Sequence, residues 1–289
     1  MKPFVYIVAH TVPEAVSALR RHGGAARVLA GGTDLLSELR RPGAAQPEVV
    51  VDISRIKSLR RISREGEVIL LGPLATHAEL VQSGLVRSGA PLLGLAAASI
   101  GSPQIRNRGT IGGNIMNAAA CADTVPPLIA LGAVATLTSA DGERRCHMSG
   151  FFARPYATVA RKDELLTQVR FDALPAGARS SFVKLGRRNA LAISRLSVAT
   201  VVVTDAEGLI ADVRIVPGAA FSVWKRIMEA EHLLIGKPPS TALFAEAGRV
   251  VAGTMVRETG RRWSTEYKEP VIAALARRAL ERCFELDAR

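Results

Sequence analysis

Two short glycine-rich stretches hold the residues whose types and spacing best suit the binding of an anion. The first, "AGGTDLL" at 30–36, follows an apolar run, and the second is "TIGGN" at 110–114. Glycine is favoured where the chain takes a positive φ or lets another group approach the backbone closely. Consecutive amides at a strand-to-helix junction form a natural cradle for an anion. Each stretch therefore predicts either a tight turn or half of an anion site.

Together the two stretches offer enough donors to hold a pyrophosphate without any lysine. The predicted donors are main-chain amides and two hydroxyls, those of Gly31, Gly32, Gly112, Gly113, Thr33 and Thr110. Asp123 lies just beyond and either accepts hydrogen bonds from a ribose or adenine, as acidic residues do in other dinucleotide sites, or caps a helix over 124–133. Neither G-x-x-x-x-G-K-[ST] nor G-x-G-x-x-G occurs at these stretches, which argues against a P-loop or a Rossmann site.

The composition describes a chain that can bury a large core. Of its 289 residues 48% are apolar and 22% are charged, so we expect two or three structural units. The longest apolar runs fall well short of the roughly 18 residues needed to cross a bilayer. The N-terminus "MKPFVYIVAH" lacks the pattern of a cleavable signal. We therefore expect a cytoplasmic protein with no transmembrane segment.

The net charge of +12 raises the question of nucleic-acid binding, because clustered Lys and Arg bind phosphate backbones. The arginine doublets, however, are spread along the whole chain, and aromatic residues make up 4% of it, so stacking platforms for bases are scarce. The positive charge is better interpreted as a solvated surface, or as a surface that binds an acidic partner subunit. We expect no nucleic-acid partner.

The cysteines, histidines and carboxylates predict neither a metal site nor a catalytic residue. Cys121, Cys146 and Cys283 are too scattered for a disulfide framework or a four-thiolate cluster. The histidines lack a spacing such as H-E-x-x-H, and the motifs contain no paired carboxylates and no nucleophile with an adjacent base. Cys121 is expected to be a small buried thiol.

Residues 1–55 are typical of a small parallel α/β unit. Thr11 and Glu14 form a capping pattern with Pro13 in the first turn of a helix. The expected elements are a helix over 10–24, a strand over 26–30, a helix over 34–41 and a strand over 48–54. The first glycine-rich stretch then lies at the carboxyl end of a strand, where ligands of such sheets usually bind.

Residues 56–175 predict an α+β unit with antiparallel strands. Thr76 and Glu79 form a second capping box. The expected elements are hairpins over 60–72 and 133–148, helices over 77–84, 90–101 and 124–133, and a strand over 164–171.

Residues 176–289 predict a three-stranded antiparallel sheet followed by helices. The expected strands are one over 179–188 and a hairpin over 197–219, and the expected helices cover 221–236, 241–253 and 269–286. Trp224 is expected in the core or at an interface. One face of the last helix is predicted to hold Ile272, Leu275, Ala279 and Cys283.

Three stretches in this order and spacing resemble a known family. They are "AGGTDLL", "IRNRGTIGGNIMNAAACADTVPPLIALGA" and "FVKLGRRNALAISRLSVAT". The chain resembles, over essentially its whole length, the FAD-binding medium subunit of the molybdenum hydroxylases, the group of carbon monoxide dehydrogenase and the xanthine dehydrogenases. The resemblance implies an α+β fold: a two-subdomain FAD-binding fold of the vanillyl-alcohol-oxidase/p-cresol-methylhydroxylase type, with a smaller C-terminal domain of a three-stranded antiparallel sheet and a helical bundle.

The resemblance also implies a set of FAD-binding positions. Around the pyrophosphate it implies Ala30, Gly31, Gly32, Thr33, Asp34, Leu35, Leu36, Thr110, Ile111, Gly112, Gly113 and Asn114. Elsewhere on the cofactor it implies Gly101, Asp123 at the adenosine end, Leu166 or its neighbour Leu165, Lys184, and Ile193 against the isoalloxazine ring. Other members have a tyrosine where this chain has Ile193, and an apolar residue packs on the ring without a hydrogen bond to it.

The function that the resemblance implies is electron transfer through FAD. A small [2Fe-2S] subunit would deliver electrons from a large molybdopterin-binding subunit, in a dimer of such three-subunit units, and FAD would pass them to NAD, a quinone or dioxygen. Extra cysteines that hold a four-iron cluster in some relatives are absent between Thr110 and Phe171. The alternatives are a stand-alone FAD-dependent oxidase or dehydrogenase of the same fold, and an anion-binding or assembly module without flavin.

Overall fold

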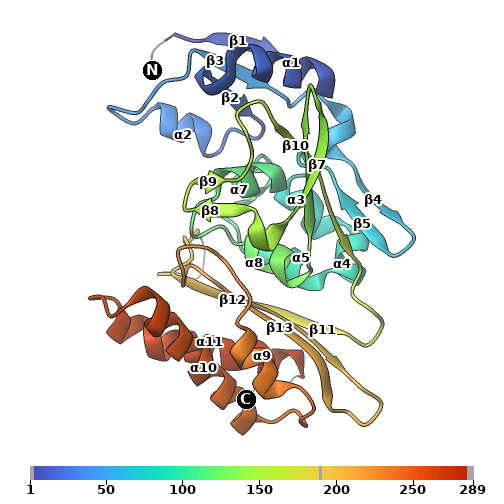
Figure 1. The fold of residues 1–289 in the computed structure, drawn as a ribbon, viewed down its shortest axis with the longest axis vertical. Helices are drawn as coiled ribbons and strands as arrows, with labels where there is room; N and C mark the ends of the chain where they lie inside the picture. The colour runs from blue at the N-terminus through green and yellow to red at the C-terminus, as the bar shows by residue number, and fades with distance from the viewer. Residues whose placement is uncertain (1–2, 189–190, 285–289) are drawn as a thin grey trace.

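Three larger β-sheets, each with its own helices, follow one another along the long axis of the molecule (Figure 1). The structure is a computed structural model that describes residues 3–188 and 191–284. The N-terminal sheet lies at one end, the middle sheet and its helices follow, and the C-terminal sheet with the last three helices forms the other end.

The N-terminal sheet is parallel, with strand order β1-β3-β2. Its elements are β1 (Val5–Val8), α1 (Val12–His22), β2 (Ala26–Leu29), α2 (Leu35–Leu39) and β3 (Val49–Asp52). The capping pattern of α1 is confirmed, because Thr11 accepts from the Glu14 amide and Glu14 accepts from the His10 amide. Strand β1 was not predicted: it is a short edge strand whose side chains are mostly exposed, so it lacks the apolar pattern of a buried strand.

The middle sheet is antiparallel, with strand order β4-β5-β10-β6-β7. Its strands are β4 (Ile62–Glu65), β5 (Val68–Leu71), β6 (Val134–Ser139), β7 (Gly142–His147) and β10 (Leu165–Asp172). Its helices are α3 (His77–Gln82), α4 (Gly84–Gly89), α5 (Pro91–Ala98), α6 (Pro103–Arg106), α7 (Ile111–Asn117) and α8 (Val125–Ala130). A small pair, β8 (Phe152–Arg154) with β9 (Ala157–Thr158), was not predicted. The hairpins and the Thr76–Glu79 capping box are confirmed.

The C-terminal sheet is buried on both faces. It is antiparallel in the order β11 (Arg179–Leu185), β12 (Leu196–Thr204) and β13 (Ile210–Gly218), as predicted. Because side chains alternate along a strand, Ala199 and Val201 join the core of the middle helices, whereas Val198 and Val202 join the core of the last helices. Those helices are α9 (Met228–Leu234), α10 (Thr241–Thr259) and α11 (Thr265–Cys283).

The predicted helix over 221–236 is wrong in its first half, since α9 begins only at Met228. Trp224 precedes the helix and packs edge-on against Phe152 at 4.7 Å, in the core of the middle helices. The Ile227 amide donates to the Ile215 carbonyl, so this segment follows β13 instead of coiling. Tertiary packing therefore overrides a helical spacing of apolar residues. The predicted core position of Trp224 is confirmed.

Helix α10 is longer than predicted at its C-terminal end, and helix α11 is longer than predicted at its N-terminal end. Helix α10 continues past 253 to Thr259, and α11 begins at Thr265. The four residues predicted on one face of α11 are all buried. Positions 285–286 of the predicted helix lie outside the described residues.

The α+β fold class is confirmed, with a C-terminal three-stranded antiparallel sheet packed on helices. The boundaries 1–55, 56–175 and 176–289 stay predictions. Within the described ranges, no helix is both long and apolar enough to cross a membrane.

Candidate functional site

The first glycine-rich stretch lies between the N-terminal and middle sheets. It leaves β2 at Ala30 and leads into α2. A β-carbon added to Gly31 would lie 1.9 Å from the Arg108 carbonyl oxygen, so the two backbones are in direct contact there. Gly32 has a φ of +77°. Glycine is therefore required at Gly31 for close approach and at Gly32 for backbone conformation.

The second stretch begins helix α7, which corrects the interpretation of this stretch as a tight turn. Thr110 is the N-cap of α7 and accepts from the Gly113 amide at 3.0 Å. The Gly112 amide donates to the Pro73 carbonyl at 2.9 Å. A β-carbon on Gly112 would lie 2.4 Å from the Pro73 side chain. These two glycines therefore let α7 pack on the segment before α3, and their amides already have acceptors within the chain.

The side chains beside these glycines are also engaged. Ile111 is fully buried in the middle core. Asn114 accepts at its side-chain oxygen from the Thr124 hydroxyl at 2.7 Å. Position 114 thus ties α7 to the start of α8.

The amides of the first stretch remain available. The amides of Gly31, Gly32 and Thr33 donate no hydrogen bond to a main-chain carbonyl of the described residues outside the regular helices and strands. Asp34 is an exposed residue, yet partial desolvation of its carboxyl raises the pKa of that group, a shift that a hydrogen bond from Thr33 partly offsets. The sequence predicted free amide donors in both stretches, and the structure leaves those of the first stretch free.

A small pocket of about 70 Å³ lies where the two stretches meet. Three predicted positions line it, namely Ala30, Gly31 and Thr110. The sequence interpretation missed its other lining residues, Ser54, Arg60, Leu74, Thr76, Asn107 and Arg108. Two of these residues are arginines. The sequence predicted a site of main-chain amides and hydroxyls and did not include these arginines. Arg60 is held by Glu79 at 2.8 Å. The quoted motif "IRNRGTIGGN" contains Arg108, which was the available signal.

A second group of predicted residues is organised around a buried ion pair. Lys184 on β11 donates to an Asp123 carboxylate oxygen at 2.6 Å and to the Ser99 carbonyl at 3.0 Å. Ser194 donates to the other Asp123 oxygen. Burial raises the pKa of Asp123, while the Lys184 charge and the bonds from Lys184 and Ser194 lower it. The carboxylate therefore joins the segment before α8 to β11 and to the β11–β12 loop.

Two more predicted positions flank this ion pair. Gly101 has a φ of +46°, and its β-carbon would lie 2.9 Å from Ile105. It follows Ser99, whose carbonyl Lys184 binds. Ile193 precedes Ser194 and is 76% exposed. The fold thus gathers Gly101, Asp123, Lys184 and Ile193, which come from the loop after α5, the segment before α8, strand β11 and the β11–β12 loop. Asp123 does not cap α8, whose N-cap Thr124 has no side-chain cap bond. Ser194 is the member that the sequence interpretation missed.

Cys121 lies two residues before Asp123 in the chain. Its pKa is raised by burial and by the charges of Asp123 and Asp34. Cys121 is partly buried, which corrects the expectation of a buried thiol.

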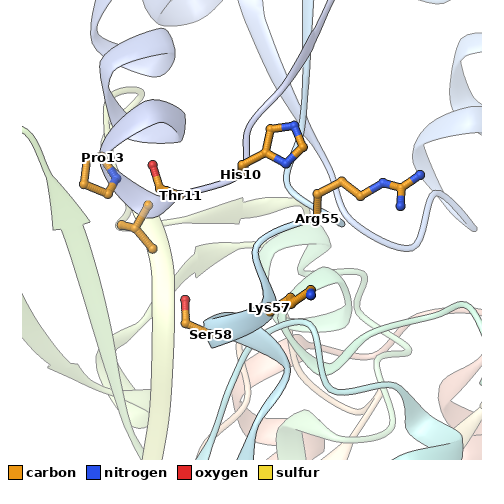
Figure 2. Close-up of a pocket in the computed structure, with 7 residues that line it drawn as sticks. His10, Thr11, Pro13, Arg55, Lys57 and Ser58 are labelled. Atoms are coloured by element: carbon orange, nitrogen blue, oxygen red, sulfur yellow. The ribbon is translucent and has the colours of Figure 1, made fainter.

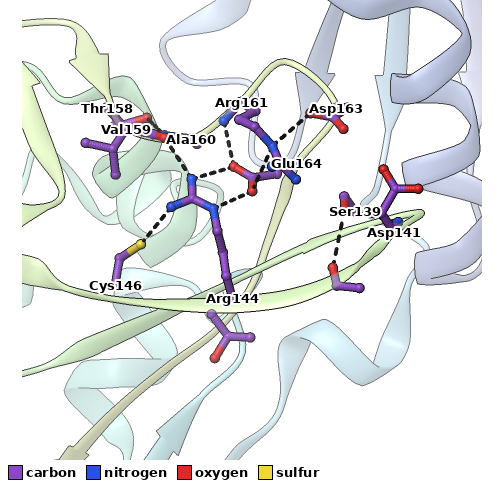
Figure 3. Close-up of polar contacts among 12 residues, drawn as sticks. Ser139, Asp141, Arg144, Cys146, Thr158, Val159, Ala160, Arg161, Asp163 and Glu164 are labelled. Atoms are coloured by element: carbon purple, nitrogen blue, oxygen red, sulfur yellow. Dashed lines mark hydrogen bonds and ion pairs between the residues drawn. The ribbon is translucent and has the colours of Figure 1, made fainter.

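The two leucines predicted near the cofactor have buried side chains. Leu166 belongs to the middle core and Leu165 to the N-terminal core, so a ligand would meet the strand's backbone rather than either side chain. An ion-pair network fixes the start of this strand (Figure 3). Arg144 donates two hydrogen bonds to Glu164, at 2.5 and 2.7 Å, and one to the Val159 carbonyl at 2.8 Å.

A separate, open pocket of about 480 Å³ lies at the carboxyl ends of β1 and β3 (Figure 2). It is lined by His10, Thr11, Val12, Pro13, Arg55, Lys57 and Ser58, none of them a predicted cofactor residue. In Figure 2 the Arg55 side chain extends away from Thr11 and Pro13. Among the described residues, no group of three or more His, Cys, Asp or Glu side chains is placed to hold a metal ion.

Comparison with known protein families matches nearly the whole chain. Residues 2–173 match the model described as the FAD binding domain in molybdopterin dehydrogenase. Residues 181–283 match the CO dehydrogenase flavoprotein C-terminal domain. Two such domains in this order define a flavoprotein.

Individual relatives agree over their full lengths. The chain is 33% identical to the 6-hydroxypseudooxynicotine dehydrogenase complex subunit alpha of Paenarthrobacter nicotinovorans, over 98% of this chain and 96% of that protein. It is 30% identical to the nicotinate dehydrogenase FAD-subunit of Eubacterium barkeri, over 94% and 93%. A chain of the solved carbon monoxide dehydrogenase from Hydrogenophaga pseudoflava superimposes with a TM-score of 0.92 and 31% identity, over 100% of both chains. The chain belongs to the family of FAD-binding subunits of molybdopterin dehydrogenases.

Proposed function

We propose that this chain binds FAD between its N-terminal and middle sheets and serves as the electron-transfer flavoprotein of a molybdopterin-dependent hydroxylase or dehydrogenase. The observation that carries the proposal is the contact of Gly31 with the Arg108 backbone. It brings the first glycine-rich stretch against the residues that lead directly into the second, as binding of one diphosphate requires. The family of the chain supports the choice of FAD as the diphosphate ligand.

At the diphosphate, we assign binding to residues 30–36 and 110–114. The free amides of Gly31, Gly32 and Thr33 donate hydrogen bonds to phosphate oxygens. These hydrogen bonds are stronger than bonds between neutral groups, because the acceptor is charged. Arg60 and Arg108 line the same pocket and offset the negative charge. Ile111, Gly112, Gly113 and Asn114 act by seating α7, since their buried side chains or amides already have partners.

Toward the rest of the cofactor, we assign contacts to Gly101, Asp123, Leu166, Lys184 and Ile193. The Asp123–Lys184 pair places a carboxyl group and an amino group beside the ligand, and each is the hydrogen-bond partner of the other. An exposed Ile193 offers an apolar surface for a flat ring. Leu166 contributes backbone, because its side chain lies in the core.

Bound FAD supplies both one-electron and hydride chemistry, and the protein supplies binding, orientation and electrostatics. We assign the [2Fe-2S] clusters to a small partner subunit and the molybdopterin cofactor to a large one. A dimer of these three-subunit units and a cytoplasmic location are further parts of the proposal. The name of one relative, a dehydrogenase complex subunit, supports assembly with other chains.

The test is purification of the tagged chain from its native source, with a visible spectrum and metal analysis. We expect a yellow protein with about one FAD per chain that co-purifies with an iron–sulfur protein and a molybdenum protein. A yellow chain that arrives alone and oxidises an organic substrate would favour the stand-alone flavoenzyme. A folded, colourless chain that does not take up FAD would contradict the proposal.

A further inference from the structure

The turn between α10 and α11 exposes a tryptophan almost completely. Trp263 is 95% exposed, more than any other large apolar side chain among the described residues. Tyr267, one helical turn later, is 48% exposed. Large exposed aromatic side chains are costly to leave in water, and Trp and Tyr are enriched at the centres of protein interfaces.

Cations surround these aromatics without paired acids. Arg195 lies over the Tyr267 ring at 5.9 Å. Lys268 donates to the Ala219 carbonyl at 3.2 Å, and Arg262 to the Thr259 carbonyl at 3.1 Å. None of the three cations pairs with a carboxylate among the described residues, whereas the neighbouring Arg261 is paired with Glu269 at 3.4 Å.

The charges of Arg262 and Arg195 both act on Lys268. The pKa of Lys268 is lowered, first by burial and then by the charges of Arg262 and Arg195. Repulsion between like charges that lack a direct carboxylate partner is unfavourable in the isolated chain, and an acidic surface placed against them would relieve that repulsion. We call Arg195, Arg262, Trp263, Tyr267 and Lys268 the basic aromatic surface.

This surface continues into the β11–β12 loop. Arg195 follows Ser194, which is bonded to Asp123, and Ile193 is exposed immediately before it. A protein docked on the basic aromatic surface would therefore lie next to the proposed flavin site. Figure 1 shows α10 and α11 packed along the C-terminal sheet at the end of the molecule that the N-terminal sheet does not reach.

We propose that the basic aromatic surface docks an acidic face of a partner subunit of the electron-transfer complex, with Trp263 as the central anchor. The inference rests on the proposed function, because the partner is a subunit of that complex. The chain's net charge of +12 favours an acidic partner. Trp, Tyr and Arg, the residues of this surface, are the types that carry most binding energy at interfaces.

The experiment measures assembly of the FAD-loaded chain with the remaining purified subunits by titration calorimetry at low and physiological salt. The variants are Trp263→Ala and Arg262→Glu, and Arg87→Glu on the exposed side of α4 is the matched control. We expect the two variants to weaken assembly by about 30-fold or more, with a smaller salt dependence for Arg262→Glu. The control should assemble like the wild type. Because Trp263 makes almost no contact with the rest of the chain, FAD content and thermal stability should be unchanged.

Three outcomes would overturn the inference. One is wild-type affinity in both variants while the wild-type complex forms normally. Another is loss of a dimer of the isolated chain in Trp263→Ala, seen by light scattering, which would make the surface a contact between two copies. The third is equal weakening by Arg87→Glu, which would show a general charge effect. Failure of the wild-type, FAD-loaded chain to bind any such subunit would instead contradict the proposed function.

Discussion

Replacing Gly31 with alanine tests whether the contact between the two glycine-rich stretches builds the site. The new β-carbon would lie 1.9 Å from the Arg108 carbonyl oxygen and 2.8 Å from its carbonyl carbon. Both atoms belong to backbone, so the strain cannot be released by a side-chain rotation. The two segments must separate by about 1 Å, and overpacking of this kind costs about 1–3 kcal/mol.

The expected effect on FAD follows from that separation. If about 2 kcal/mol of strain is released by moving the stretches apart, FAD binds about 30-fold more weakly. FAD at 1,000 times the wild-type Kd stabilises the wild type by about 4 kcal/mol and the variant by about 2 kcal/mol. Urea unfolding with and without FAD measures both quantities.

A matched substitution separates this contact from a general effect of glycine. Gly253→Ala lies in the exposed interior of α10, where an added β-carbon meets no atom within 4 Å. It should stabilise the chain by about 0.5–1 kcal/mol and leave FAD affinity unchanged. Wild-type stability and FAD affinity in Gly31→Ala would refute the reasoning.

Three further predictions concern buried polar groups. Burial lowers the pKa of His77 to about 4, so the unfolded chain binds more protons than the folded chain between about pH 6.5 and 4. His77 therefore makes the free energy of unfolding fall by about 2 kcal/mol from pH 7 to 4.5. Urea titrations over this pH range should show a flatter dependence in His77→Leu. Lys184→Met should destabilise the chain by about 3 kcal/mol, because it leaves Asp123 buried without its cation, and adding Asp123→Asn should recover part of the loss in a double-mutant cycle. Arg144→Met should lower thermal stability far more than Arg20→Met, because its partner Glu164 has a side chain that is only 1% exposed. The side chains of the Arg20–Asp141 pair are 61% and 67% exposed. Equal losses in the two variants would count against a stabilising role for the Arg144–Glu164 network.

Local signals in the sequence predicted the local structure well. The Thr76–Glu79 capping box needs only residues three apart, and it forms as predicted. The hairpins around Gly66 and Gly142 follow from turn residues with positive φ. That the positions taken from the motifs bind FAD stays a prediction.

The sequence could not predict contacts that depend on distant packing. Ser194 and Asp123 are far apart in the chain, and their bond exists because β11 packs beside α5 and β12 packs beside α8. The helical spacing from Trp224 to Leu234 misled for the same reason, since Trp224 is drawn into the core next to Phe152. At Gly31, glycine indicated a close approach, and only the fold identified Arg108 as its partner.

The most direct measurement of the central claim is calorimetric titration of the FAD-stripped chain with FAD, for the wild type and for Gly31→Ala in parallel. The account predicts one FAD bound per wild-type chain and clearly weaker binding by the variant. A folded wild-type chain that binds no FAD, or a variant that binds it with equal affinity, would contradict a flavin site built where Gly31 meets Arg108.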